Sequence, residues 1–483
     1  MAENRRSPGP RPLTALPSVW VLCLGFAALH LMLSLLIPLV EDEAYYALWA
    51  TVPSAGYYDH PPVIAWMIAA GEALFGTNRF GVRFISVAAF AAVTPMVWRM
   101  AWLASGEERV ARMAALFYNA TALALILGFT ATPDAPSTFF WALTAWAVTE
   151  AIAAPDRATR WWVLAGLGAG LGVLSKFTNL FLWVGLTLWL IGSREGRQAL
   201  KRPVVWAAAG LALLVLVPFA LWNDAHHWVG LTRQFGRVGA GHGAEIGGLA
   251  LFLALVVLEV TPGIAYGALR GLRPGTETGR FQIWLTAPLV LYMAYHALHT
   301  DVQANWLIPI FPGLAVLAAL GARRWRAGAV WAAAGGAMAV ASVVFALALW
   351  PGTAIFPGHN PPNETKGWPR FLTALRATAT QNGAQWIATT HYGLTGSLAF
   401  YLPRVPVWSI TAPERYLFRG AIPQHLCKAP GLLVTVGEPS AATLGRFTRT
   451  GHPVLLKRTA GGAVLDSYTA TPVQGLLPCA ATN

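Results

Sequence analysis

Residues 204–222 read VVWAAAGLALLVLVPFALW and residues 329–350 read AVWAAAGGAMAVASVVFALALW, without one charged side chain in either stretch. A helix of this length crosses a hydrocarbon core of about 30 Å. The same character extends over the 483 residues of the chain, of which 56% are hydrophobic and 11% are charged. Soluble domains carry about 25% charged residues, so the sequence predicts a polytopic α-helical membrane protein.

Apolar runs recur along the first 350 residues and predict about eleven transmembrane helices. We place them at 18–40, 81–103, 111–130, 135–153, 161–174, 177–192, 204–222, 248–269, 281–299, 305–322 and 329–350. Every second loop is rich in Arg and Lys, which is typical of the cytoplasmic side of a membrane. Much of the net charge of +13 lies in these loops, so the charge reflects membrane topology and does not indicate a nucleic-acid partner. The distribution predicts a cytoplasmic N-terminus and an extracytoplasmic C-terminus.

The orientation places two longer segments on the outer face. Residues 41–80 form the first outer loop, where helical apolar spacing predicts two short helices along the membrane surface. The transmembrane domain, residues 1–350, is followed by a linker at 351–369 that is rich in Pro, Gly and Asn. Residues 370–483 then form a soluble domain.

Helical and β-like patterns alternate in this last domain and predict a small α/β fold. The expected elements are helices at 370–381 and 393–401 and strands at 385–390, 405–410, 431–436 and 453–469. The domain also contains Cys427 and Cys479. In an extracytoplasmic domain these two cysteines could form a disulfide, and two free thiols are the alternative.

Acidic residues gather in the outer loops. Glu41, Asp42 and Glu43 directly follow the first apolar run. Consecutive carboxylates repel one another, so they form either a solvated helix cap or part of a site. The aromatic residues of the following AYYALWA favour a site, because they would hold the carboxylates against a surface.

Two further acidic motifs contain prolines, which fix the backbone. In Gly56–Pro62, GYYDHPP, we select Tyr57, Tyr58, Asp59 and His60 as candidate site residues, and a rigid turn is the alternative interpretation. Asp134 lies between Pro133 and Pro136 in a very short outer loop. Its side chain could equally cap the helix that follows.

Lys176 interrupts two apolar runs on the predicted outer side. An ionisable group at such a depth indicates a functional site with an anionic partner, although snorkelling to the interface is the alternative. Weaker candidates are Asn223, His226, Arg233 and Asn305. The tryptophans beside Asn223 and His226 could belong to an interfacial belt. No metal-ligand spacing is diagnostic, so a divalent metal is neither indicated nor excluded.

These candidates combine carboxylates, a lysine, histidines and aromatic rings at one membrane face, where a lipid-borne substrate would meet them. In a sugar transfer, one carboxylate can deprotonate the acceptor, and cations can stabilise the charge that develops on a departing phosphate. The groups fit this chemistry better than they fit a channel. Glu259 lies inside an apolar run, and the sequence does not decide its role.

Six ordered motifs resemble the GT-C membrane glycosyltransferases of the family 39 type, which are related to protein O-mannosyltransferases and to the aminoarabinose transferase of lipid A. The motifs are EDEAYYALWA, GYYDHPPVIAW, TPDAPSTFFWAL, LSKFTNLFL, WNDAHHW and ANWLIPIFP. The resemblance covers residues 35–325 well and the tail loosely. It implies a multi-pass enzyme of the bacterial inner membrane with a periplasmic C-terminal domain.

The resemblance also implies the substrates and the roles of individual residues. The donor is a polyprenyl-phosphate sugar, and the acceptor is lipid A, another envelope glycan or lipid, or a protein hydroxyl. Asp42 is the expected general base of an inverting reaction, with Glu43 and Asp134 as further acidic residues. Lys176 matches the family's lysine and is expected at the donor phosphate. From the motifs themselves we add His60 and Arg233 at the donor phosphate and Tyr45, Tyr57, Tyr58, Asp59, Asn223, His226 and Asn305 at the substrates.

Two positions depart from the aminoarabinose transferases. Tyr45 stands where they carry an arginine, and His60 stands where they carry a lysine, so fixed positive charge is missing near the expected phosphate. This argues against aminoarabinose as the sugar. The rival hypothesis is a transporter or flippase of lipid-linked sugars, which predicts inverted repeats and binding groups near the middle of the membrane. A non-catalytic binding protein is the third hypothesis.

Overall fold

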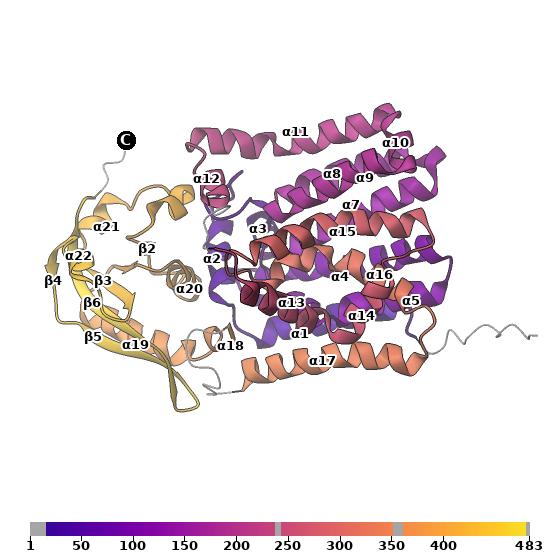
Figure 1. Ribbon diagram of the computed structural model, residues 1–483. Coiled ribbons are helices and arrows are strands. Elements are labelled where there is room, and N and C mark those ends of the chain that lie inside the picture. The colour runs from indigo at the N-terminus through magenta and orange to yellow at the C-terminus, as the bar shows by residue number, and fades with distance from the viewer. Residues whose placement is uncertain (1–15, 237–242, 351–360, 480–483) are drawn as a thin grey trace, which may run out of the picture.

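The computed structural model describes residues 16–236, 243–350 and 361–479 of the chain. Figure 1 shows a helical bundle built from the described residues up to position 350, with a smaller domain that contains a β-sheet at one end of it. The chain is thus a mostly helical, multi-span membrane protein with a C-terminal mixed-sheet domain, as the sequence predicts.

The bundle and its connections contain the following helices, where η marks a 3-10 helix. They are α1 (Val19–Leu36), α2 (Glu41–Ala50), α3 (Val63–Phe75), α4 (Arg79–Ser105), α5 (Glu108–Ala120), α6 (Ala122–Leu127), α7 (Asp134–Ala153), η2 (Pro155–Arg157), α8 (Thr159–Val173), η3 (Phe177–Asn179), α9 (Leu180–Gly192), α10 (Arg194–Leu200), α11 (Pro203–Ala225), α12 (Val229–Phe235), α13 (Ile246–Val260), α14 (Pro262–Arg270), α15 (Glu277–His296), η4 (Ala304–Ile310), α16 (Phe311–Gly321) and α17 (Ala327–Leu349).

Among the described residues, four helices, α1, α4, α11 and α17, are long and apolar enough to cross a membrane, and they match four of the predicted spans. The bent pair α13 and α14 is a fifth if it is taken as one span. The other expected spans are helices that fall short of this standard in length, continuity or hydropathy. The count of about eleven crossings therefore stays a prediction.

Two expected spans are not continuous helices. The run at 111–130 breaks at Thr121, whose side chain accepts a hydrogen bond from the Ala124 amide and so caps α6. The run at 248–269 breaks at Thr261, where α13 and α14 meet at 98°. Pro262 is the cause there, since proline disfavours a helical conformation of the preceding residue and is itself well placed in a first helical turn.

The first outer loop contains the two predicted short helices, α2 and α3, and other parts of the chain enclose α2. Nine of its ten residues are buried, and Asp42 is the exception. In Figure 1, α2 lies between the bundle and the C-terminal domain. The C-terminal domain covers α2, and the position of α2 along the membrane surface stays a prediction.

The C-terminal domain is built from short helices around one mixed sheet. Its elements are α18 (Pro361–Glu364), α19 (Trp368–Gln381), β1 (Trp386–Thr389), α20 (Tyr392–Tyr401), β2 (Val407–Ser409), η5 (Pro413–Arg419), α21 (Gln424–Lys428), β3 (Gly431–Val436), α22 (Ala441–Leu444), β4 (Phe447–Thr450), β5 (Val454–Ala460) and β6 (Ala463–Leu476). The expected linker at 351–369 lies partly outside the described residues, and its last part contains α18 and the start of α19.

The sheet has the strand order β2-β1-β3-β6-β4, with β5 also paired to β6. Strands β1, β2 and β3 run parallel, and β6 is antiparallel to its neighbours. Alternate residues face opposite sides, as in any strand: Leu432 and Val434 pack against α19 and α20, and Leu433 packs on the other side with Leu426 of α21. The predicted strand at 453–469 is in fact a hairpin of β5 and β6.

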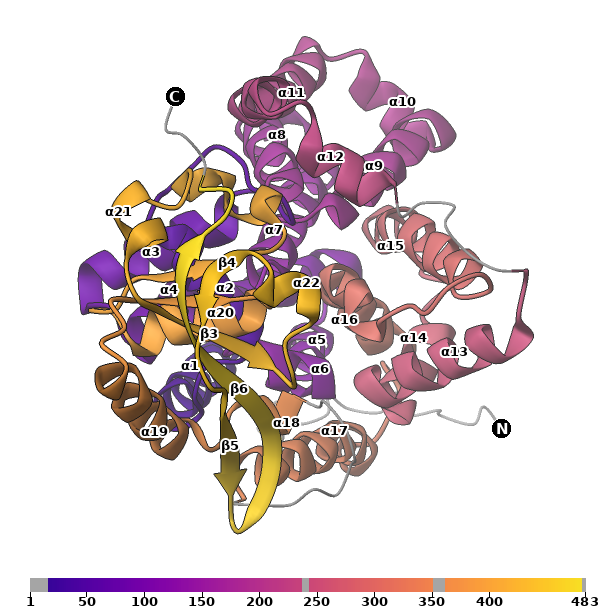
Figure 2. The same cartoon turned by 90° about the vertical axis from the view of Figure 1, so that its left-hand side faces the viewer.

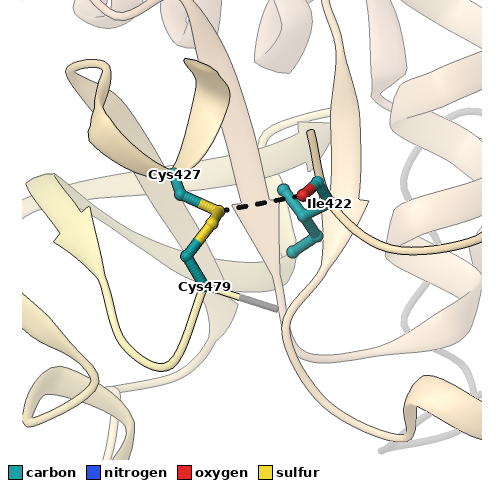
Figure 3. The surroundings of a disulfide bond; sticks show 3 residues. All are labelled: Ile422, Cys427 and Cys479. Carbon is teal, nitrogen blue, oxygen red and sulfur yellow. Dashed lines mark hydrogen bonds between the residues drawn. A yellow bond between two sulfur atoms is a disulfide. The ribbon is translucent and has the colours of Figure 1, made fainter. Parts of the chain in front are cut away.

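Cys427 and Cys479 form a disulfide, with their Cα atoms 5.9 Å apart. Figure 3 shows this bond beside Ile422, whose carbonyl oxygen lies 3.9 Å from the Cys427 sulfur. The bond joins α21 to the segment that follows β6, 52 residues later in the chain. Of the two alternatives that the sequence left open, the structure has the paired one.

The C-terminal domain docks on α2 through two glycines of α20. A Cβ atom at Gly396 would lie 2.5 Å from the Tyr45 amide nitrogen, and one at Gly393 would clash with the Glu41 carboxylate. Only glycine permits this approach of the two helices. Seen from its own side, the domain covers part of the bundle, and α9, α11, α13 and α15 extend beyond its edge (Figure 2).

Candidate functional site

The three consecutive carboxylates of α2 point in different directions. Successive residues of a helix are rotated by about 100°, so three neighbours cannot share one face. Asp42 lines a cavity together with Glu41, whose carboxylate lies 3.6 Å from the imidazole of His391 in the C-terminal domain. Glu43 points into the protein and does not line the cavity.

Glu43 forms a buried ion pair with Arg83 of α4. The atoms Nε and Nη2 of Arg83 lie 2.7 and 2.5 Å from the two carboxylate oxygens, and both side chains are fully buried. Glu43 also accepts hydrogen bonds from the amides of Val40 and Ala131. Arg83 donates to the carbonyl oxygens of Ile37 and, through Nη2, Pro38. These contacts join α2 to the ends of α1 and α4, so Glu43 has the environment of a structural residue.

Asp134 and Lys176 meet although 42 residues separate them. The Lys176 ammonium lies 2.7 Å from Asp134 Oδ1, with side chains 11% and 8% exposed. Asp134 is the first residue of α7, whose N-cap residue is Pro133, and the Asp134 carboxylate accepts a hydrogen bond from Lys176. The alternative in which Asp134 caps this helix is therefore wrong, and Lys176 has the anionic partner that its depth requires.

Asp59 lies between two arginines. Its Oδ2 is 2.5 Å from Nη1 of Arg415, in η5 of the C-terminal domain, and its Oδ1 is 4.0 Å from Nε of Arg233. The Tyr45 hydroxyl donates to Asp59 Oδ2 over 3.0 Å. The ring of Tyr58 lies 5.7 Å from the Arg233 guanidinium and 5.8 Å from that of Arg415.

A cavity of about 1110 Å³ connects these groups. Seven of the predicted site residues line it: Asp42, Tyr45, Asp59, His60, Asp134, Lys176 and Asn305. Its apolar walls are the helix ends nearest the C-terminal domain, with Leu180, Phe181 and Val184 from α9, Tyr292 and Met293 from α15, and Val344, Phe345 and Ala348 from α17. The cavity thus joins charged groups to apolar surface of the bundle.

The remaining predicted residues lie outside the cavity lining. Tyr57 is buried in a hydrophobic cluster and stacks on Trp49 at 4.3 Å. Asn223 is fully buried and donates to the Phe219 carbonyl. His226 stacks on Trp222 at 4.3 Å, with its Nδ1 2.7 Å from the Trp222 carbonyl oxygen. The cavity lining does not include Glu43, Tyr58 or Arg233 either.

Burial raises the pKa of the Asp42 carboxyl above its usual range. A hydrogen bond of 3.0 Å from the Tyr392 hydroxyl opposes this effect, and the negative charges of Asp59, Asp134 and Glu43 add to it. A carboxyl group with a raised pKa can accept a proton near neutral pH more effectively than an ordinary one. Asp42 therefore has the properties of a general base.

Sequence reasoning missed the residues that the C-terminal domain contributes. Tyr392 and Arg415 both line the cavity, at more than 300 positions from the first outer loop. Neither stands in a distinctive motif, since the surrounding GLTGSLAFY and PERYLFR have ordinary helical patterns. Only the contact between domains could have revealed them.

The described residues were also considered as possible metal ligands. Within residues 16–236, 243–350 and 361–479, no group of three or more His, Cys, Asp or Glu side chains is arranged to hold a metal ion.

The chain is similar to one known protein family and to several characterised membrane transferases. Residues 59–222 match the family model described as dolichyl-phosphate-mannose-protein mannosyltransferase. The lipid A galacturonosyltransferase RgtD of Rhizobium johnstonii is 27% identical over 400 residues, which cover 78% of this chain and 81% of the relative. The undecaprenyl phosphate-alpha-4-amino-4-deoxy-L-arabinose arabinosyl transferase of Pseudomonas aeruginosa is 29% identical over 401 residues, which cover 78% of this chain and 69% of the relative.

Solved structures share the fold. The crystal structure of ArnT from Cupriavidus metallidurans in the apo state superposes with a TM-score of 0.68 at 15% identity, over 94% of this chain and 97% of that one. The structure of the same protein bound to undecaprenyl phosphate superposes with a TM-score of 0.67 at 16% identity, over 96% and 99% of the two chains. The likeness extends over both the helical bundle and the C-terminal domain.

Proposed function

Because the chain is a GT-C membrane glycosyltransferase, related to the protein mannosyltransferase family and to lipid A glycosyltransferases, we propose that it glycosylates lipid A or another envelope component. The sugar comes from a polyprenyl-phosphate donor. Lipid A is the preferred acceptor, because the curated relatives named above include a lipid A galacturonosyltransferase. Another envelope glycan or lipid, or a protein hydroxyl, is the alternative acceptor.

The observation that carries the proposal is the composition of the cavity. One space contains the carboxylate of Asp42, the ammonium of Lys176 and the apolar ends of α9, α15 and α17. A polyprenyl-phosphate sugar has the matching parts, namely an apolar chain, an anionic phosphate and a sugar at the reacting end. A lipid donor can therefore place its phosphate near the cations while its chain remains against apolar helix surface.

The reaction follows from these positions. Asp42 takes the proton of an acceptor hydroxyl, whose oxygen attacks the anomeric carbon of the donor sugar. The bond between that carbon and the phosphate oxygen breaks, and its electron pair leaves with the polyprenyl phosphate. Attack opposite to the leaving group inverts the anomeric centre. Cations near the phosphate stabilise the charge that develops on it.

The ion pair with Asp134 gives Lys176 a defined place before the donor arrives. The phosphate then shares the ammonium group with Asp134, which explains why a second acidic residue belongs to the site. His60 and Asn305 line the same cavity and are available to the sugar or the acceptor. Glu43 supports the site through Arg83 and does not contact the substrates.

The proposed orientation is that of a bacterial inner-membrane enzyme with its site on the periplasmic side. Basic loops predict a cytoplasmic N-terminus and about eleven crossings. The disulfide between Cys427 and Cys479 supports a periplasmic C-terminal domain, since disulfides persist in oxidising compartments. We propose residues 1–350 as the membrane domain, 351–369 as the linker and 370–483 as the periplasmic domain.

A flippase of lipid-linked sugars is the alternative function. It requires alternating access around a site near the middle of the membrane. Here the charged groups lie at helix ends next to the C-terminal domain, which favours transfer over transport. A flippase would leave the sugar on its polyprenyl phosphate, so the chemical state of the sugar distinguishes the two functions.

Envelope composition tests the proposed function. Mass spectrometry of lipid A and of the other envelope glycans should show one sugar missing in a deletion strain and restored by the wild-type gene. The Asp42→Asn gene should not restore it, although the protein is present in the membrane. Identical glycans in all three strains, in a background without related transferases, would contradict the proposal.

The hydrogen bond from Tyr392 predicts a change in pH dependence. Because it stabilises the charged form of Asp42, its loss in Tyr392→Phe raises the pKa of Asp42 further. The acid limb of the plot of kcat against pH should move to higher pH, so the variant loses more activity at acidic than at alkaline pH. Tyr266→Phe, at an exposed tyrosine of α14, should leave the profile unchanged. An unmoved acid limb in folded Tyr392→Phe would show that Asp42 is not the titrating base.

A further inference from the structure

Arg415 reaches the cavity from the C-terminal domain. It belongs to η5, lines the cavity and is only 17% exposed. Its Nη1 lies 2.5 Å from Asp59 Oδ2, so the first outer loop and the C-terminal domain meet in this ion pair. A guanidinium group, whose removal from water costs free energy, therefore lies at the wall of a cavity that is also lined by other charged groups.

Several contacts fix the position of Arg415. The Tyr45 hydroxyl lies 3.3 Å from the Arg415 carbonyl oxygen as well as 3.0 Å from Asp59, so it contacts both partners of the ion pair. The guanidinium group lies 4.7 Å from the centre of the Tyr392 ring and 5.8 Å from that of Tyr58. Aromatic faces attract such a cation, and the group is therefore oriented before any ligand binds.

The distribution of formal charge singles out this part of the cavity. Lys176 is paired with Asp134 and the two charges cancel. Asp59, in contrast, lies between Arg415 and Arg233, and these three side chains carry one net positive charge. At 13 to 32% exposure these groups are only partly screened by water. The arginine pair therefore supplies the positive charge that the Lys176 pair alone does not.

We infer that Arg415 is an anion-binding residue of the donor site and contacts the phosphate of the polyprenyl donor. This inference rests on the proposed function, because that function makes the anion a lipid phosphate. A guanidinium group presents several N–H donors in one plane and binds phosphate oxygens in pairs. Asp59 pairs with Nη1 of Arg415 and competes with the phosphate for this cation.

The inference gives the C-terminal domain a part in substrate binding. Arg415 reaches the cavity because α20 docks closely on α2 through Gly393 and Gly396. The same docking brings the Tyr392 hydroxyl to Asp42. Donor binding and proton transfer thus both depend on residues from beyond position 370, and the site is complete only when this domain is in place.

Binding of undecaprenyl phosphate to the purified full-length protein tests the inference. The affinity of Arg415→Gln should be about 10- to 100-fold weaker than that of the wild type, the usual effect of losing a charged hydrogen-bond partner. Arg404→Gln, at an exposed arginine of the same domain, should bind as the wild type does. Undecaprenol, which has no phosphate, should bind equally to all three proteins.

The outcomes separate this inference from the proposed function. If the wild type does not bind undecaprenyl phosphate, the proposed function fails. If the wild type and folded Arg415→Gln bind it equally, only the role of Arg415 fails. Loss of lipid A binding with unchanged undecaprenyl phosphate binding would assign Arg415 to the acceptor instead and overturn the inference.

A second variant keeps the inference testable if Arg415→Gln does not fold. Asp59→Asn breaks the same ion pair but keeps the guanidinium group. Because the arginine then has one anionic competitor fewer, Asp59→Asn should bind undecaprenyl phosphate at least as tightly as the wild type. Weaker binding by this variant would contradict an anion-binding role for Arg415.

Discussion

Asp42→Asn should lose nearly all sugar transfer while the protein folds as before. Asparagine has almost the shape of aspartate, but its amide cannot accept the proton of the acceptor hydroxyl. We expect kcat to fall by about 100- to 10,000-fold, the usual contribution of a general base. The Michaelis constant for the donor should change little, since Lys176 and the apolar walls remain. Initial rates with a polyprenyl-phosphate sugar in reconstituted membranes measure both parameters.

Thermal unfolding of the same preparation is the necessary companion measurement. Asp42 is the one residue of α2 that is only partly buried, and it lines a cavity, so its replacement by an amide of the same size should leave the unfolding temperature near that of the wild type. Asp301→Asn, at an exposed carboxylate, serves as the matched control and should keep full activity. Substantial activity in Asp42→Asn would exclude Asp42 as the base.

Glu43→Gln, one position later, should have the opposite pattern of effects: it should reduce the stability of the protein, whereas Asp42→Asn reduces its activity. The variant leaves the charge of Arg83 fully buried without its carboxylate, and breaking a buried pair from one side costs about 3–5 kcal/mol. We expect low yield and a strongly reduced unfolding temperature. Thermal unfolding in detergent and the amount of protein in the membrane measure the effect.

Two further variants isolate the cause. Glu43→Gln combined with Arg83→Met removes both charges and should recover part of the stability, because no buried charge is left unpaired. Glu108→Gln, which breaks the partly exposed pair of Glu108 and Arg112 on α5, should cost less than about 1 kcal/mol. A stable but inactive Glu43→Gln would instead indicate that Glu43 takes part in the chemistry.

The contrast between Asp42 and Glu43 shows where sequence reasoning reached its limit. The triplet at 41–43 could be recognised as chemically unusual, because carboxylates seldom cluster at a membrane boundary without a purpose. Which of the three carboxylates faces a cavity depends on the rotation of α2 about its axis. Apolar residues occur on all sides of AYYALWA, so the sequence does not determine this rotation. The packing of α2 against α4 and the C-terminal domain decided it.

Local patterns predicted local structure well. The four helices that are long and apolar enough to cross a membrane, the two short helices of the first outer loop and most elements of the C-terminal domain follow from periodicity and length. The bend before Pro262 could also have been read from the sequence, since a proline so placed starts a helix more readily than it continues one. The break at Thr121 has no comparable signal.

Contacts between distant segments were beyond the sequence. Asp134 and Lys176 were each selected from the sequence separately, the acid as a site residue or a helix cap and the lysine as a cation that requires an anion. Arg415 and Tyr392 had no such local sign, and only the docking of α20 on α2 brings them to the cavity. The pairing of Cys427 with Cys479 likewise needed a distance that spacing does not give.

The most direct test of the account is a transfer reaction with the purified wild-type protein, an undecaprenyl-phosphate sugar and lipid A. Mass spectrometry of both lipids measures the sugar on each side of the reaction. The account predicts one glycosylated lipid A for each undecaprenyl phosphate released, and almost none of either with Asp42→Asn. Donor that is consumed equally by both proteins, or movement of intact donor across the membrane without a glycosylated acceptor, would contradict it.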